Sequence, residues 1–104
     1  MVQNNMAFEE RIRQMIAETK SIGYNPTYFI RMVQELGAVT ACKQLINNEK
    51  LHDGLCRLWK EHRLDLTIEN IILEPQWAEL FSESERTLAK NKLLKLGYKG
   101  ETNE

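Results

Sequence analysis

Several features are scarce in this sequence, and each scarcity excludes a class of protein. The 104 residues include only two prolines, two cysteines and five glycines. No apolar run approaches the roughly 18 residues that a membrane-spanning helix needs. The first residues also lack the cationic stretch followed by an apolar run that marks a secretion signal. These absences predict a cytoplasmic protein that has no membrane partner.

An excess of either charge is also missing. Fourteen lysines and arginines stand against 15 aspartates and glutamates, which leaves a net charge of −1. General attraction for a polyanion is therefore weak, because sequence-independent binding to nucleic acid depends mostly on neutralising phosphates. The two cysteines, Cys42 and Cys56, are expected to be reduced thiols in a cytoplasmic protein. A 42% hydrophobic content in one domain's length of chain is typical of a globular protein.

The apolar residues that are present repeat with the period of a helix. Phe8, Ile12, Met15, Thr19 and Ile22 follow one another at spacings of four, three, four and three. This spacing places them in one narrow stripe along a helix of about five turns. Similar patterns recur along the rest of the chain.

Helix-ending residues separate these patterns. Gly23, Gly37 and Gly97 each follow an apolar periodic segment, and glycine enters the left-handed conformation at a helix end without steric cost. Pro75 cannot donate a hydrogen bond inside a helix, so a new turn is expected to begin there. The segment 82–85, SESE, has the pattern of a capping box at the start of the last helix.

The prediction is an all-α fold, a compact orthogonal bundle of about five helices plus one short helical turn. We expect a single domain over residues 1–104, with the helix over 1–23 standing somewhat apart and a frayed tail over 99–104. Within it, Asn25 is predicted to cap the second helix. The segment 63–67, RLDLT, is predicted to be an extended link.

A cluster of potential metal ligands does attract attention. The segment 51–62, LHDGLCRLWKEH, holds His52, Cys56 and His62, and Cys42 precedes it. Structural zinc sites usually take their ligands as two close pairs, whereas the gaps here are ten, four and six residues. No glycine-rich oxyanion loop accompanies Cys56 as a nucleophile. The sequence therefore predicts no metal, no cofactor, no catalytic residue and no enzyme activity.

Charged residues are interpreted as surface groups. The carboxylates considered for acid–base chemistry are mostly flanked by basic residues, so pairing on helix surfaces explains them. These carboxylates are Glu9, Glu10, Glu61, Asp65 and Glu69. The last helix carries five basic residues that spread around its axis, which favours a solvated helix. These residues are Arg86, Lys90, Lys92, Lys95 and Lys99.

Nucleic-acid binding is the alternative function. The segment 32–46, MVQELGAVTACKQLI, has the helix, glycine and second helix of a helix-turn-helix, and it offers Thr40, Lys43 and Gln44 to bases. Lys43, however, stands where such a motif needs an apolar residue. Lys90 and Lys95 of the last helix are the other basic candidates.

Protein interaction is the favoured function. The stripe of the first helix can act as a coiled-coil seam that pairs with another protein or a second copy, or it can pack inside the domain. The segment 77–81, WAELF, has the i, i+3, i+4 spacing of residues that insert into a groove, with the core again as the alternative. The interaction candidates are Phe8, Ile12, Met15, Ile22, Trp77, Leu80 and Phe81.

About three-quarters of the chain carries a pattern of aromatic, proline, glycine and leucine positions. They are Tyr24, Pro26, Phe29, Gly37, Leu58, Trp59, Leu64, Leu66, Trp77, Leu80, Phe81, Gly97 and Tyr98. This pattern resembles a small all-helical module of uncharacterised bacterial proteins, found alone or attached to restriction and defence nucleases. The resemblance implies an accessory or interaction role in bacterial defence and transfers no active site. The alternative is a DNA-binding accessory or regulatory factor.

Overall fold

The computed structural model describes residues 2–48 and 53–97, and the regular elements in this part of the chain are all helices, with no β-strand. The predicted all-α fold class is confirmed. The α-helices are α1 (Val2–Ser21), α2 (Thr27–Leu36), α3 (Ala38–Asn47), α4 (Asp53–Lys60), α5 (Ile68–Ile72) and α6 (Glu83–Lys95). Two short 3-10 helices, η1 (Leu64–Leu66) and η2 (Pro75–Trp77), flank α5.

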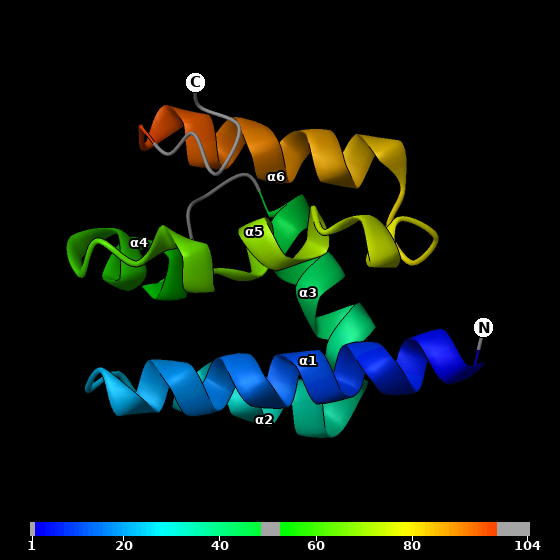
Figure 1. The fold of residues 1–104 in the computed structure, drawn as a ribbon, viewed down its shortest axis with the longest axis horizontal. Helices are drawn as coiled ribbons and strands as arrows, with labels where there is room; N and C mark the ends of the chain where they lie inside the picture. The colour runs from blue at the N-terminus through cyan, green and yellow to red at the C-terminus, as the bar shows by residue number, and fades with distance from the viewer. Residues whose placement is uncertain (1, 49–52, 98–104) are drawn as a thin grey trace.

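The helices are arranged around α3, which crosses the molecule. In Figure 1, α1 and α2 lie together at the bottom, α6 lies at the top, and α4, η1 and α5 lie between them. Helix α3 rises from α2 towards α6 and contacts α1, α2 and α6 (Figure 1). Both ends of this central helix are therefore surrounded by other elements.

The main core lies where α1, α2, α3, α5, η2 and α6 meet. Phe8 of α1 is fully buried, and its ring makes edge contacts with the rings of Trp77 and Phe81 at centroid distances of 5.2 Å and 5.3 Å. A smaller cluster joins Leu55 of α4, Leu64 of η1 and Leu93 of α6. Helix α1 contributes Phe8, Ile12 and Met15 to the main core, so its middle part is packed into the domain.

Several helix ends follow the predicted local signals. Ser82 accepts a hydrogen bond from the Glu85 N–H at 3.0 Å while the Glu85 carboxylate accepts one from the Ser82 N–H at 3.0 Å, which confirms the capping box. Gly23 and Gly37 adopt positive φ angles of 93° and 86°, where a side chain would be strained. Pro75 begins η2, as predicted.

Two local predictions are wrong. Asn25 does not cap α2, since the helix begins at Thr27 after Pro26 with no side-chain cap. The segment 63–67 is also not extended, because the Leu66 and Thr67 N–H groups bond back to the carbonyls of Arg63 and Leu64 and close a 3-10 turn.

Within the described ranges, no helix is both long enough and apolar enough to cross a membrane.

Candidate ligand pocket and its surroundings

Most of the predicted interaction residues lie inside the domain. The side chains of Phe8 and Ile12 are 0% exposed, and those of Met15, Trp77 and Phe81 are also buried. Ile22 and Leu80 are partly exposed. The stripe of α1 and the segment around η2 therefore pack against each other inside the domain. This is the alternative in which both segments belong to the core and not to an interface with another chain.

The predicted nucleic-acid residues are spread over two helices. Thr40 and Gln44 are exposed on α3, and Lys90 and Lys95 are exposed on α6. Lys43 points to the N-terminus of α6, where its Nζ lies 2.8 Å from Glu85 Oε1 and 5.2 Å from the centre of the Phe81 ring. The ammonium group of Lys43 therefore has an internal partner.

The cysteine and histidine residues do not assemble into a centre within the described residues, where no group of three or more His, Cys, Asp or Glu side chains could hold a metal. Burial raises the pKa of the Cys42 thiol well above its usual value, and the carboxylates of Glu69 and Glu9 raise it further. A thiol of this kind is a poor nucleophile. His62 is exposed, and the prediction that concerned His52 lies outside the described residues.

Charged side chains hold the two ends of α3. At its N-terminus, Glu9 Oε2 accepts a hydrogen bond from the Ala38 N–H at 2.7 Å. At its C-terminus, Lys92 Nζ donates to the carbonyl oxygens of Leu45, Ile46 and Asn48 at 2.9 to 3.0 Å. An anion at the N-terminus and a cation at the C-terminus both complement the helix dipole.

Lys92 and Glu69 were both predicted to be surface charges, and the structure buries both. Lys92 is 7% exposed and Glu69 is 0% exposed. Burial lowers the pKa of the Lys92 ammonium group, and the charge of Glu69 opposes that effect. The prediction of a fully solvated last helix is therefore wrong, because the Lys92 side chain of α6 turns inward to donate to carbonyls at the end of α3.

Glu85 joins α3 to the start of α6. Its carboxylate accepts hydrogen bonds from Lys43 at 2.8 Å, from the Asn47 side chain at 2.9 Å and from the Ser82 N–H. Burial alone would raise the pKa of Glu85, but the bonds from Lys43, Ser82 and Asn47 lower it below the usual value.

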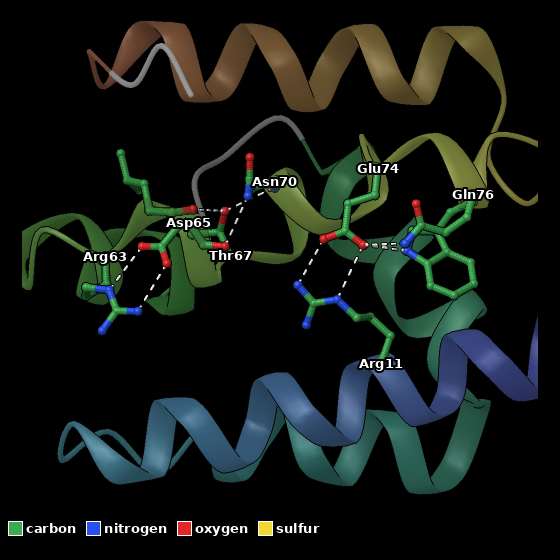
Figure 2. Close-up of polar contacts among 9 residues, drawn as sticks. Arg11, Arg63, Asp65, Thr67, Asn70, Glu74 and Gln76 are labelled. Atoms are coloured by element: carbon green, nitrogen blue, oxygen red, sulfur yellow. Dashed lines mark hydrogen bonds and ion pairs between the residues drawn. The ribbon is translucent and has the colours of Figure 1, made fainter. Parts of the chain in front are cut away.

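A second carboxylate, Glu74, joins α1 to the turn after α5. Arg11 donates to both of its oxygens, at 3.3 Å and 2.9 Å, as Figure 2 shows. The indole N–H of Trp77 and the side-chain amide of Gln76 also donate to Glu74, at 2.8 Å and 3.2 Å. Like Glu9 and Glu85, this carboxylate is used to fix the fold.

A pocket of about 520 Å³ lies among α1, α2, α3, α4 and α5. Its buried lining consists of apolar side chains from α1, α2, α4 and α5, one proline and two threonines. The buried lining residues are Met15, Thr19, Phe29, Met32, Leu58, Thr67 and Ile68, together with Pro26 at the entry to α2. We call these eight residues the floor of the pocket.

The two threonine hydroxyls of the floor are already hydrogen-bonded. Thr19 Oγ1 donates to the Ile16 carbonyl at 2.8 Å, and Thr67 Oγ1 donates to the Leu64 carbonyl at 2.7 Å while accepting from the Asn70 N–H. The other side chains of the floor are apolar, and since both hydroxyls have internal partners, the two threonines leave no free donor there.

The rim of the pocket is polar but uncharged. It consists of the exposed lining residues Asn25, Thr27, Tyr28, Gln44 and Asn48. The remaining lining residues, Tyr24, Leu45 and Gly54, are partly exposed. No lysine, arginine, aspartate or glutamate is among the described lining residues.

Arg57 supports the rim without lining the pocket. Its guanidinium lies 5.1 Å from the centre of the Tyr24 ring and is 3.5 Å from the Gly23 carbonyl oxygen, to which it donates. The side chain of Tyr28 extends into solvent and is 71% exposed. Two aromatic rings therefore border the mouth of the pocket. Arg57 contacts the ring of Tyr24, and the ring of Tyr28 is exposed.

Two of the residues that were proposed from the sequence for protein or nucleic-acid binding line this pocket, namely Met15 and Gln44. The nearest local signal was the spacing of Tyr24 and Phe29, which suits a hydrophobic staple about an Asn25 cap. The structure places Pro26 at the N-cap position instead, although both residues line the pocket. The pocket itself needs residues from α1 to α5, which no local pattern brings together.

Comparison of the chain with protein-family models, with curated proteins and with solved structures finds no match in any of the three. The resemblance to a bacterial defence module therefore stays a prediction.

Proposed function

We propose that this domain is a non-enzymatic protein-interaction module, and that the pocket binds an apolar segment of the partner protein. The observation that carries the proposal is a pocket of about 520 Å³ with an apolar floor and no charged residue among its described lining. This volume falls within the range of roughly 300 to 1,000 Å³ that is common for ligand pockets.

The composition of the pocket supports a role in protein recognition. The cores of protein interfaces are depleted in charged residues and enriched in aromatic residues and methionine. Here Met15 and Met32 belong to the floor, and Tyr24 and Tyr28 border the mouth. Methionine side chains are flexible and adapt to different apolar partners.

The use of the charged groups supports binding rather than catalysis. Glu9, Glu74, Glu85 and Lys92 each hold a backbone or a side chain of another element in place. A general acid or base needs a titratable group directed at a substrate site, and the described lining of the pocket supplies none.

The proposal is tested by selecting binders from a random-sequence peptide library displayed on phage, with the full chain as bait. We expect enrichment of peptides that carry uncharged apolar residues. Thr27→Trp should abolish their binding, because Thr27 is exposed on the rim and a bulky ring there fills the mouth. Thr87→Trp is the matched control, since Thr87 is exposed on α6 and lies outside the pocket.

Fluorescence anisotropy with the enriched peptides supplies the measurement. The proposal is contradicted if no peptide is enriched, or if the peptides bind wild type and Thr27→Trp with equal affinity. A steep salt dependence of binding to duplex DNA, lost with Lys90→Glu and Lys95→Glu, would instead favour the nucleic-acid alternative.

A further inference from the structure

Two side-chain amides on the rim suggest how the pocket selects its partner. Asn25 lies in the turn before α2 and Gln44 lies on α3, so they approach the mouth from different elements. Both side chains are exposed, and within the described residues neither is given a hydrogen-bond partner by the structure. Each therefore offers one acceptor and two donors to a ligand.

A peptide group is the natural complement of such an amide. The side-chain amide of Asn or Gln carries the same donor and acceptor pair as a main-chain peptide unit, so the two can form reciprocal hydrogen bonds. Phosphate or carboxylate partners are disfavoured, because no cation is among the described lining residues and the nearby Arg57 guanidinium already pairs with Glu61 and contacts Tyr24.

The floor in turn favours an aromatic ring over other side chains. Met15, Met32 and Phe29 are buried there, and thioether sulfur makes favourable contacts with aromatic rings. A charged side chain is excluded, because it would lose its hydration without gaining a counter-ion.

We propose that the pocket recognises an uncharged aromatic side chain of the partner, and that Asn25 and Gln44 hydrogen-bond to the peptide groups flanking that residue. This inference rests on the proposed function and names the chemistry of the partner segment. In this arrangement the partner's aromatic ring contacts the floor of the pocket, and the partner's main chain contacts the rim.

Three small probes separate these two contributions. N-acetyl-tryptophanamide has an aromatic ring, two peptide groups and no charge. 3-Methylindole has the ring alone, and N-acetyl-lysinamide has the peptide groups with a charged side chain. Each is titrated into the full chain, and binding is followed by amide chemical shifts in ¹H–¹⁵N spectra.

We expect N-acetyl-tryptophanamide to bind with a dissociation constant of about 1 to 10 mM, as weak fragments do. 3-Methylindole should bind several-fold more weakly, and N-acetyl-lysinamide should not bind. Asn25→Ala and Gln44→Ala should each weaken the binding of N-acetyl-tryptophanamide by roughly 2- to 10-fold, the range for one net hydrogen bond. Neither substitution should change the binding of 3-methylindole.

Matched controls are Asn91→Ala and Gln14→Ala, which remove exposed side-chain amides outside the pocket. The inference is overturned if the lysine probe binds as well as the tryptophan probe, or if Asn25→Ala and Gln44→Ala behave like the controls. If 3-methylindole still binds in that second case, the apolar pocket of the proposed function stands and only the peptide recognition fails. If neither aromatic probe binds, the inference is also overturned, and the displayed peptides decide the proposed function separately.

Discussion

At the scale of single residues, Lys92 shows how a charged side chain serves the interior of this domain. Its ammonium group reaches three carbonyl oxygens at the end of α3, and it is almost completely buried. Leu45 and Ile46 belong to the last turn of α3, where carbonyl groups lie beyond the helix's own ladder of donors, and α6 provides a donor there. The position is therefore part of the core although its residue type is typical of a surface.

Replacing Lys92 with methionine tests this role. The substitution keeps the apolar stem and removes the donor, so three carbonyls lose their hydrogen bonds. We expect the free energy of unfolding to fall by about 2 to 3 kcal/mol. Lys90→Met, at an exposed position of the same helix, should change it by less than about 0.5 kcal/mol. Urea unfolding followed by circular dichroism measures both, and equal effects would show that Lys92 has no special role.

Glu85 gives a prediction about pH. Its pKa is lower in the folded chain than the usual value, so the folded state favours the charged carboxylate. The resulting stabilisation is present above about pH 4.3, the unperturbed value for glutamate, and it is lost as pH falls through the folded-state pKa. Glu85→Gln should therefore be less stable than wild type by about 1 to 2 kcal/mol at pH 7, and the difference should shrink in acid.

Glu83→Gln is the control for that experiment, because Glu83 lies in the same first turn of α6 and is exposed. Its difference from wild type should be small at every pH. A Glu85→Gln difference that stays constant from pH 7 to pH 3 would contradict the role assigned to the carboxylate.

At the scale of elements, α3 is the helix on which the others converge. Glu9 of α1 accepts a hydrogen bond from its first N–H, Lys92 of α6 donates to its last carbonyls, and Lys43 on its side binds Glu85. The pocket depends on this fixation, since Gln44, Leu45 and Asn48 of its lining come from α3 and the residue just after it.

The cap at the start of α3 can be removed on its own. Glu9→Ala leaves the Ala38 N–H without its acceptor, and we expect a loss of about 1 kcal/mol in the free energy of unfolding, as for other helix caps. Glu10→Ala removes only an exposed ion pair with Arg13 and should cost less than about 0.5 kcal/mol. Thermal and urea unfolding measure the two losses. A larger loss of unfolding free energy for Glu10→Ala than for Glu9→Ala would contradict the role of Glu9 as the cap of α3.

Element boundaries could be predicted from the sequence where the signal is local. The capping box at Ser82 and Glu85 spans four residues, and Gly23 and Pro75 limit their helices through their own backbone chemistry. The burial of Lys92 could not be predicted, since its partners precede it by 44 to 47 residues. The pocket was missed for the same reason, because it needs side chains from α1 to α5.

At the scale of the whole molecule, the periodic stripe of α1 was correctly predicted to be helical. Periodicity marks an apolar face but does not say whether the same chain or another chain covers it. The structure covers Phe8, Ile12 and Met15 with the chain's own residues. A homodimer through this stripe would require the core to open.

Ile12→Asp separates these alternatives. Because the Ile12 side chain is 0% exposed, an aspartate there places a charge in the core, and we expect the chain to unfold. Gln14→Asp, on the exposed side of the same helix, should leave the fold intact. Circular dichroism and light scattering report the outcome, and a folded monomer produced from a wild-type dimer would show that the stripe is an intermolecular seam.

Binding of an apolar aromatic group in the uncharged pocket can be observed residue by residue, as a chemical-shift map recorded during titration with 3-methylindole. We expect the backbone amide signals of floor and rim residues to move together, including those of Met32, Leu45 and Gly54. Signals around Thr87, which is exposed on α6 and lies outside the pocket, should stay in place. Shifts that are absent, or that gather away from these lining residues, would contradict the account.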